Sequence, residues 1–153
     1  MKKLFILLSS VLIAISSYSH NPIHIDEKVL RSFEVQFPNA QKVIWQESED
    51  AFLVSFVEDG IRVRIVYLRN GALTHFLRYY FEENLPLDVR LNLKNKYPGK
   101  TIYGITEENI LSNIQNQAKT VYYIKLEDAS SWFTIKVQKN RKMRLIEKLN
   151  KEL

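Results

Sequence analysis

The sequence predicts an α+β protein built from two tandem repeats, each a helix followed by a four-stranded antiparallel meander. Two stretches carry apolar residues at helical spacing, and each ends at an aromatic residue followed by proline. Each stretch precedes short apolar or alternating runs that are typical of strands separated by turns. Because one helix covers only one face of a sheet, the other face must meet solvent or the other repeat.

The first predicted helix is marked by Val29, Phe33 and Phe37, which recur every four residues and therefore share one face. Pro38 ends it, because the residue before a proline avoids helical backbone angles. The Asn-Gly pair at 70–71 predicts a tight hairpin turn. The strands expected in this repeat are residues 41–45, 51–57, 61–68 and 72–80.

The second predicted helix repeats this spacing with Val89, Leu93 and Tyr97, and Pro98 repeats the stop. Its expected strands are residues 101–105, 120–126, 132–138 and 143–149. Residues 106–119 are a polar insertion between the first two of these strands, and we expect a long loop or a short helix there. Such a loop either carries function or is a solvated insertion.

Residues 1–19 have the pattern of a cleavable secretory signal peptide: Lys2 and Lys3, an apolar run, then small residues before a cut after Ser19. The alternative is a membrane anchor, but the apolar run is shorter than the roughly 20 residues that a spanning helix needs. We therefore expect a periplasmic or secreted protein without a membrane span in the mature chain. Its expected parts are a lead-in (20–25), repeat 1 (26–84) and repeat 2 (85–153).

Charge and cysteine content narrow the function classes. The formal net charge is only +5, which is a poor basis for nucleic-acid binding, so no nucleic-acid partner is expected. The chain has no cysteine, which excludes disulfides, a cysteine nucleophile, a thiolate metal site and an N-terminal lipidated cysteine. Packing alone must therefore hold the fold.

Catalytic and metal-binding patterns are not evident in the sequence. The three histidines, His20, His24 and His75, are not spaced as metal ligands or placed near a nucleophile motif. Neighbouring carboxylates such as Glu82 and Glu83 diverge on a helix or strand, which favours solvated charge. We predict no catalytic residues, no metal and no cofactor.

Strand alternation predicts a face that could bind a partner. Ile61, Val63 and Ile65 point to one side of their strand, whereas Arg62 and Arg64 point to the other. Arginine and aromatic residues are enriched at interface hot spots. The alternative is an ordinary polar outer face, with Trp132 buried between the repeats. The predicted partner-binding residues are Arg62, Arg64, His75, Tyr79, Trp132, Thr134 and Lys136.

The order of these motifs resembles the PepSY-like proteins of Bacteroidetes-type bacteria, which are also described as β-lactamase-inhibitor-like. The residues that carry the resemblance are Phe37-Pro38-Asn39-Ala40, Val43, Trp45, Tyr67, Asn70-Gly71, Leu85-Pro86 and Tyr97-Pro98. The resemblance implies a secreted tandem α+β fold without a cofactor, in a family of poorly defined function. The second repeat departs from the first, with Gly104-Ile105 in place of Ile44-Trp45, and no inhibitor contact residue can be carried over.

The sequence therefore predicts a secreted, non-catalytic module that binds a protein or peptide, with inhibition or regulation of an extracytoplasmic enzyme as one form of that function. One alternative is a small-ligand or envelope sensor that uses the groove between the repeats. The other is an uncharacterised hydrolase.

Overall fold

The computed structural model describes residues 23–112, 117–138 and 141–152, and over these the chain is α+β. The helices are α1 (Glu27–Gln36), the short 3-10 helix η1 (Glu82–Asn84) and α2 (Leu87–Lys96). The strands are β1 (Gln41–Glu47), β2 (Ala51–Glu58), β3 (Ile61–Leu68), β4 (Leu73–Tyr80), β5 (Thr101–Ser112), β6 (Gln117–Glu127), β7 (Ser131–Gln138) and β8 (Met143–Asn150). The predicted signal peptide, residues 1–19, lies outside the described residues.

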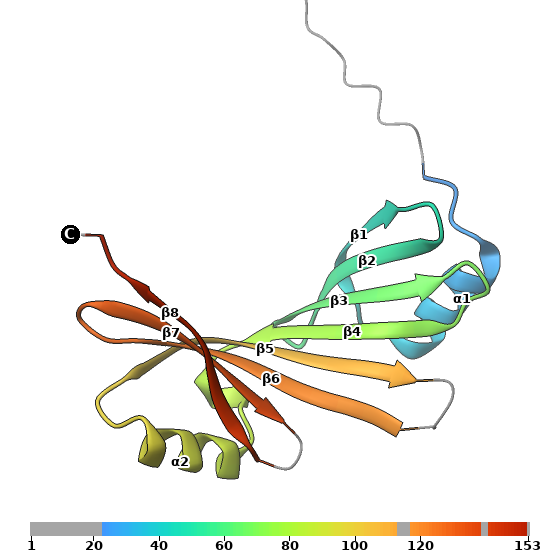
Figure 1. Ribbon diagram of the computed structural model, residues 1–153. Coiled ribbons are helices and arrows are strands. Elements are labelled where there is room, and N and C mark those ends of the chain that lie inside the picture. The colour runs from blue at the N-terminus through green and yellow to red at the C-terminus, as the bar shows by residue number, and fades with distance from the viewer. Residues whose placement is uncertain (1–22, 113–116, 139–140, 153) are drawn as a thin grey trace, which may run out of the picture.

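The strands form one continuous antiparallel sheet in the order β1 to β8 (Figure 1). Each strand pairs with its neighbour in the sequence, and β4 pairs directly with β5. The segment that contains α1 and the segment that contains α2 therefore share one sheet. Figure 1 shows α1 beside the first strands and α2 beside the last ones.

Both helices cover the same face of the sheet. Each buries two residues one turn apart: Val29 and Phe33 from α1, Val89 and Leu93 from α2. The register carries this face across the strands. Buried Val63 of β3 aligns with Arg78, which aligns with Glu107. Glu107 aligns with Tyr122, and Tyr122 aligns with buried Val137. One core cluster spans both helices and the sheet.

Each long helix ends just before a proline, as the sequence predicts. The backbone N–H of Phe37 donates to the carbonyl of Phe33 at 2.8 Å, and that of Tyr97 donates to the carbonyl of Leu93 at 2.9 Å. Both aromatic residues then leave helical geometry with nearly the same angles, φ −132° and ψ 63° at Phe37, φ −126° and ψ 64° at Tyr97. The proline that follows each of them prevents another helical turn.

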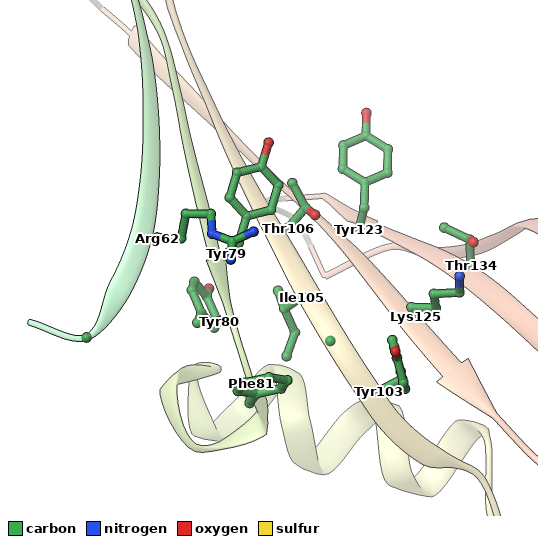
Figure 2. Close-up of a pocket in the computed structure, with 12 residues that line it drawn as sticks. Arg62, Tyr79, Tyr80, Phe81, Tyr103, Ile105, Thr106, Tyr123, Lys125 and Thr134 are labelled. Atoms are coloured by element: carbon green, nitrogen blue, oxygen red, sulfur yellow. The ribbon is translucent and has the colours of Figure 1, made fainter. Parts of the chain in front are cut away.

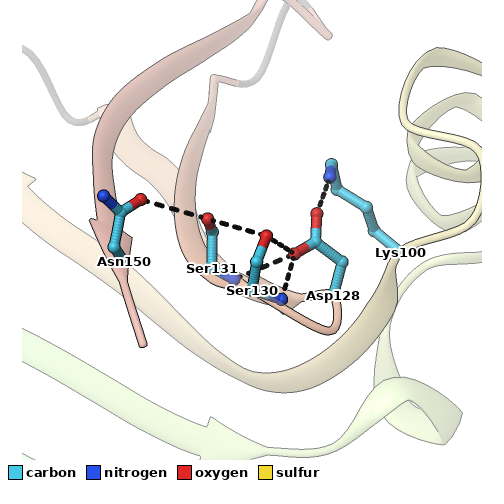
Figure 3. Close-up of polar contacts among 5 residues, drawn as sticks. All are labelled: Lys100, Asp128, Ser130, Ser131 and Asn150. Carbon is cyan, nitrogen blue, oxygen red and sulfur yellow. Dashed lines mark hydrogen bonds and ion pairs between the residues drawn. The ribbon is translucent and has the colours of Figure 1, made fainter. Parts of the chain in front are cut away.

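Tight turns connect β3 to β4 and β6 to β7, at opposite ends of the strands. Gly71 has φ +86°, which a glycine adopts without strain, and the side chain of Asn70 accepts a bond from the N–H of Ala72. Between β6 and β7, Asp128 accepts bonds from the backbone N–H groups of Ser130 and Ser131 (Figure 3).

The expectation of a loop or short helix at residues 106–119 is wrong. Residues 106–112 extend β5, residues 117–119 extend β6, and the two strands remain paired from Thr101 opposite Glu127 to Ser112 opposite Gln117. Residues 113–116 lie outside the described part of the chain. The segment forms strand although it is polar, because its backbone groups are satisfied by the ladder.

A polar cluster occupies the helix-side face of these lengthened strands. Tyr80 donates to Glu107 at 2.7 Å, Asn109 donates to the other oxygen of Glu107 at 2.9 Å, and Thr120 donates to Asn109 at 2.6 Å. Burial, reinforced by the bond to Glu107, raises the pKa of Tyr80 well above its usual range. The cluster joins β4 to β5 and β6 where the strands of the two helical segments meet.

Candidate functional site

The face of the sheet opposite the helices, here called the open face, carries a continuous row of polar and aromatic residues. Successive register pairs connect one residue from each of six strands. All six are therefore neighbours across the sheet on the same face. The row consists of Arg62, Tyr79, Thr106, Tyr123, Lys136 and Arg144.

A hollow of about 570 Å³, here called the main hollow, lies on this face across β3 to β7. Figure 2 shows Tyr79 and Tyr123 standing above the strands on its sides, with Arg62 at one end and Lys125 and Thr134 at the other. Its lining residues are Gly60, Arg62, Tyr79, Tyr80, Phe81, Tyr103, Gly104, Ile105, Thr106, Tyr123, Lys125 and Thr134.

Gly104 is the structural reason for the main hollow. It aligns with Lys125, which aligns with Thr134 on the next strand, so its missing side chain leaves a gap in the open face. A Cβ built at this position meets no atom within 4 Å. The ladder is irregular between Ile102 and Gly104, and such a bulge redirects side chains locally. Here it accompanies the exposed ring of Tyr103 at the edge of the hollow.

Aromatic rings beside the hollow are held by cations. Tyr103 packs edge-on against Trp132, with ring centroids 4.7 Å apart. Lys125 places its Nζ 4.9 Å from the Trp132 ring centre, and Lys151 places its own at 4.5 Å. Such contacts stabilise by about 0.5–1 kcal/mol when exposed. They keep flat aromatic surface on the open face in a fixed orientation.

The structure brings five of the seven predicted partner-binding residues to this region. Arg62, Tyr79 and Thr134 line the main hollow, while Trp132 and Lys136 flank it. The alternative position for Trp132, buried between the repeats, is wrong, because the ring is only half-buried and lies among open-face residues.

The other two predicted residues share the open face but do not line the main hollow. Arg64 is exposed, and its Nε donates to the Ser55 hydroxyl at 3.3 Å on the β2 side. His75 is exposed opposite Val66, farther along β4. Its Nδ1 lies 3.5 Å from the Thr74 hydroxyl, which is at the outer limit for a hydrogen bond.

Sequence reasoning missed nine of the twelve residues that line the hollow, among them Tyr103, Gly104, Tyr123 and Lys125. Period-two alternation in β6 could have found two of them, because Tyr123 and Lys125 alternate with buried Ile124 and Leu126. The departure at Gly104 was visible as a difference between the two helix-plus-strand segments. The gap that this glycine creates could not be predicted, because it depends on which strands pair beside Gly104.

The groups at this site can make stacking, cation–π and hydrogen-bonding contacts with another molecule. The site presents tyrosine and tryptophan faces, phenol and threonine hydroxyls, and cationic heads on rigid strands. In the described part of the chain, no group of three His, Asp or Glu residues could hold a metal ion. No described helix is both long and apolar enough to cross a membrane.

Comparison with solved structures shows the fold. The chain is similar to a BLIP-like protein of Bacteroides fragilis, with a TM-score of 0.63, 11% identity, and 85% of this chain and 89% of that chain covered. It is similar to a DUF2874 family protein of Bacteroides ovatus, with a TM-score of 0.63, 14% identity, and coverage of 84% and 89%.

A third similar structure is a Bacteroides eggerthii protein that has been proposed to be periplasmic, with a TM-score of 0.62, 10% identity, and coverage of 84% and 90%. No protein-family model and no curated protein sequence matches the chain. The α+β fold with two helices on an antiparallel sheet is thus that of BLIP-like proteins. At these identities the likeness concerns the fold alone.

Proposed function

We propose that this protein is a secreted, non-catalytic module that binds a segment of another protein on its open face. The observation that carries the proposal is the main hollow, an aromatic and cationic depression on a face that no helix of the described chain covers. The row of polar and aromatic residues crosses six strands, β3 to β8, which at about 4.8 Å spacing makes it about 24 Å wide. A surface of that size suits a protein partner, whose interface typically buries roughly 800 Å² per side.

Three further observations support the proposal. The solved structures of similar fold include a BLIP-like protein and a protein proposed to be periplasmic. The pattern in residues 1–19 supports export. The same backbone geometry at Phe37 and Tyr97 supports two copies of one unit, with boundaries at 26–84 and 85–153. Inhibition or regulation of an extracytoplasmic enzyme is one form that such binding would take.

Site-specific photo-crosslinking tests the proposal. A benzoylphenylalanine is placed at Thr106 within the main hollow, or at Val35, which is 76% exposed on α1 at the other side of the sheet. Each protein, starting at His20, is irradiated with envelope and secreted fractions of the source organism. We expect a partner adduct from Thr106 only.

The valine variant Gly104→Val makes this test sharper. Its added side chain would enter the empty space of the main hollow, and the backbone there does not require glycine. The adduct from Thr106 should disappear in this variant while its circular dichroism spectrum stays unchanged. An adduct from Val35 that survives Gly104→Val would overturn the proposal.

Small-ligand sensing is the second candidate, and the volume of the main hollow favours it. About 570 Å³ lies within the range of roughly 300–1,000 Å³ for small-molecule pockets. A ligand that binds the folded state raises thermal stability by mass action. A compound that stabilises the wild type but not Gly104→Val, with no protein adduct from Thr106, would favour the sensor.

A further inference from the structure

A second, smaller hollow lies on the open face beside the main one, over β6, β7 and β8. We call it the cationic hollow; its volume is about 200 Å³. Tyr123 lines both hollows, so they are adjacent. The lining residues of the cationic hollow are Tyr123, Lys136, Gln138, Lys142, Arg144 and Ile146.

Two of the cations in this hollow, Lys136 and Arg144, lie directly opposite each other on neighbouring strands, where their like charges repel. Lys136 and Arg144 are register partners on neighbouring strands, so their Cβ atoms lie about 5 Å apart. Like charges directly opposite each other destabilise a sheet. Within the described residues neither side chain makes an ion pair, and the recorded contact of Lys136 is with the Tyr123 ring, 5.2 Å from its centre. An anion between them would remove this repulsion.

The donors around the hollow suit a carboxylate. Arg144 offers a planar fork of N–H groups, Lys136 an ammonium, and Gln138 an amide. Glu147 lies on the same face, where it accepts a bond from Thr134 at 2.9 Å and offsets part of the positive charge. Three cations against this one carboxylate leave the hollow positively charged, which favours an anionic group there.

We propose that the cationic hollow binds the carboxylate of an acidic side chain on the partner segment, while a neighbouring aromatic or apolar side chain of that segment fills the main hollow. The proposal rests on the proposed function and names the chemistry of the partner. The shared Tyr123 places the two subsites side by side, so one short segment can occupy both. The partner is thus an acidic segment of a protein that also carries aromatic residues.

Nuclear magnetic resonance titration with defined peptides tests this proposal without the natural partner. The probes are acetyl-Glu-Tyr-Glu-Tyr-Glu-amide, its counterpart with glutamine in place of glutamate, and inorganic phosphate, at constant ionic strength. We expect the glutamate peptide to shift the amide signals of Tyr123, Lys136 and Arg144. The glutamine peptide should bind at least tenfold more weakly, because charge-assisted hydrogen bonds are lost.

Two double variants with the same change in charge separate local recognition from net charge. Lys136→Gln/Arg144→Gln removes two of the three cations of the hollow, and Lys28→Gln/Arg90→Gln removes one cation from each helix, behind the sheet. We expect affinity for the glutamate peptide to fall at least tenfold in the first variant and to stay within twofold in the second. Equal losses in both variants would overturn the proposal.

The other outcomes are also decisive. Equal binding of the two peptides would overturn the proposal, and phosphate shifting the same signals at lower concentration would identify a phosphate site instead. If either of these two outcomes is found while the Thr106 adduct still forms, the carboxylate subsite is rejected and the proposed function is retained. If the glutamate peptide binds as expected but no Thr106 adduct forms, the subsite stands and the proposed function fails.

Discussion

The two faces of this sheet are made from the same strands, but one face is buried under the helices and the other is exposed. In β3, Ile61, Val63 and Ile65 are buried under the helices, while Arg62 and Arg64 between them are exposed. On the helix side, aromatic rings pack against each other in the core, as Phe33 does with Phe56 at 5.2 Å. On the open face, lysine side chains lie over the rings of Trp132 and Tyr123, which stay partly exposed.

Under the proposed function, this difference assigns stability to one face of the sheet and binding to the other. Aromatic packing in the core removes apolar surface from water and leaves nothing accessible to a partner. Cations stacked on open-face rings hold those rings in place while leaving surface exposed. Substitutions on the helix side should therefore change the free energy of unfolding, and those on the open face should change binding.

The largest effect is expected on the helix side. Phe56 is 2% exposed and contacts the rings of Phe33 and Phe37. Phe56→Ala should lower the free energy of unfolding by about 3–5 kcal/mol, because it removes buried surface and leaves a cavity. Urea unfolding measures the change. Tyr79→Ala on the open face is the control and should cost less than about 1 kcal/mol; equal costs would break the division between the faces.

A pH-dependent effect is expected next on the same buried side. Burial raises the pKa of Tyr67 to about 12 from its ordinary value of 10.0, and the Ser32 hydroxyl partly offsets the rise. Because the folded pKa is the higher one, the stabilisation is complete below pH 10 and is lost as the pH rises through 12. This group should account for about 2–3 kcal/mol of alkaline destabilisation.

The variant Tyr67→Phe isolates that contribution. Between pH 9 and 12 the free energy of unfolding of the wild type should fall more steeply than that of the variant, because only the wild type loses the contribution of Tyr67. Tyr80, whose pKa is raised in the same direction, remains in both proteins. Parallel curves would show that Tyr67 ionises as readily in the folded state as in the unfolded one.

A smaller effect of opposite pH dependence is expected at the turn between β6 and β7. Lys100, 2.5 Å away, and the backbone N–H groups of Ser130 and Ser131 hold the pKa of Asp128 well below its usual value of 3.8 (Figure 3). The stabilisation is therefore present above about pH 4 and is lost as the pH falls below it. Asp128→Asn should be less stable than wild type at pH 7, and the gap should narrow at pH 2.5; a gap that is constant with pH would contradict this.

The smallest change in stability is expected in the main hollow. Gly104→Val adds a β-branched residue to a strand position with free space, so the free energy of unfolding should rise by about 0.5–1 kcal/mol. Thermal unfolding measures the change, and the binding experiments above should show a loss. A variant that is more stable than the wild type but no longer binds would show most directly that the open face contributes to binding and not to stability.

Much of the fold followed from periodicity. The alternation of Ile61 to Tyr67, the Asn-Gly turn at 70–71 and the helix stops at Pro38 and Pro98 all agree with the structure. Each of these signals arises where one side of an element is buried and the other is not. The outward direction of Arg62 follows from the same alternation.

The lengthened strands β5 and β6 could not be found in this way. Glu107, Asn109 and Thr120 face the helix side but bond to one another, so they interrupt the alternation of apolar residues on that side. Their pairing partners lie on strands from both helical segments, which periodicity within one segment does not reveal. The main hollow was missed for the same reason, since Gly104 matters through its neighbours Lys125 and Thr134.

The pairing of every strand with its neighbour in the sequence also has a consequence for how quickly the chain folds. Each hairpin closes over a short stretch of chain, so the loop entropy lost at each step is small. All-β folds with long crossovers have high contact order and fold slowly. In this sheet the β4–β5 pairing spans α2 and is the longest closure between neighbouring strands, which makes it the natural slow step: the two halves can form early and then zip together at their shared ladder.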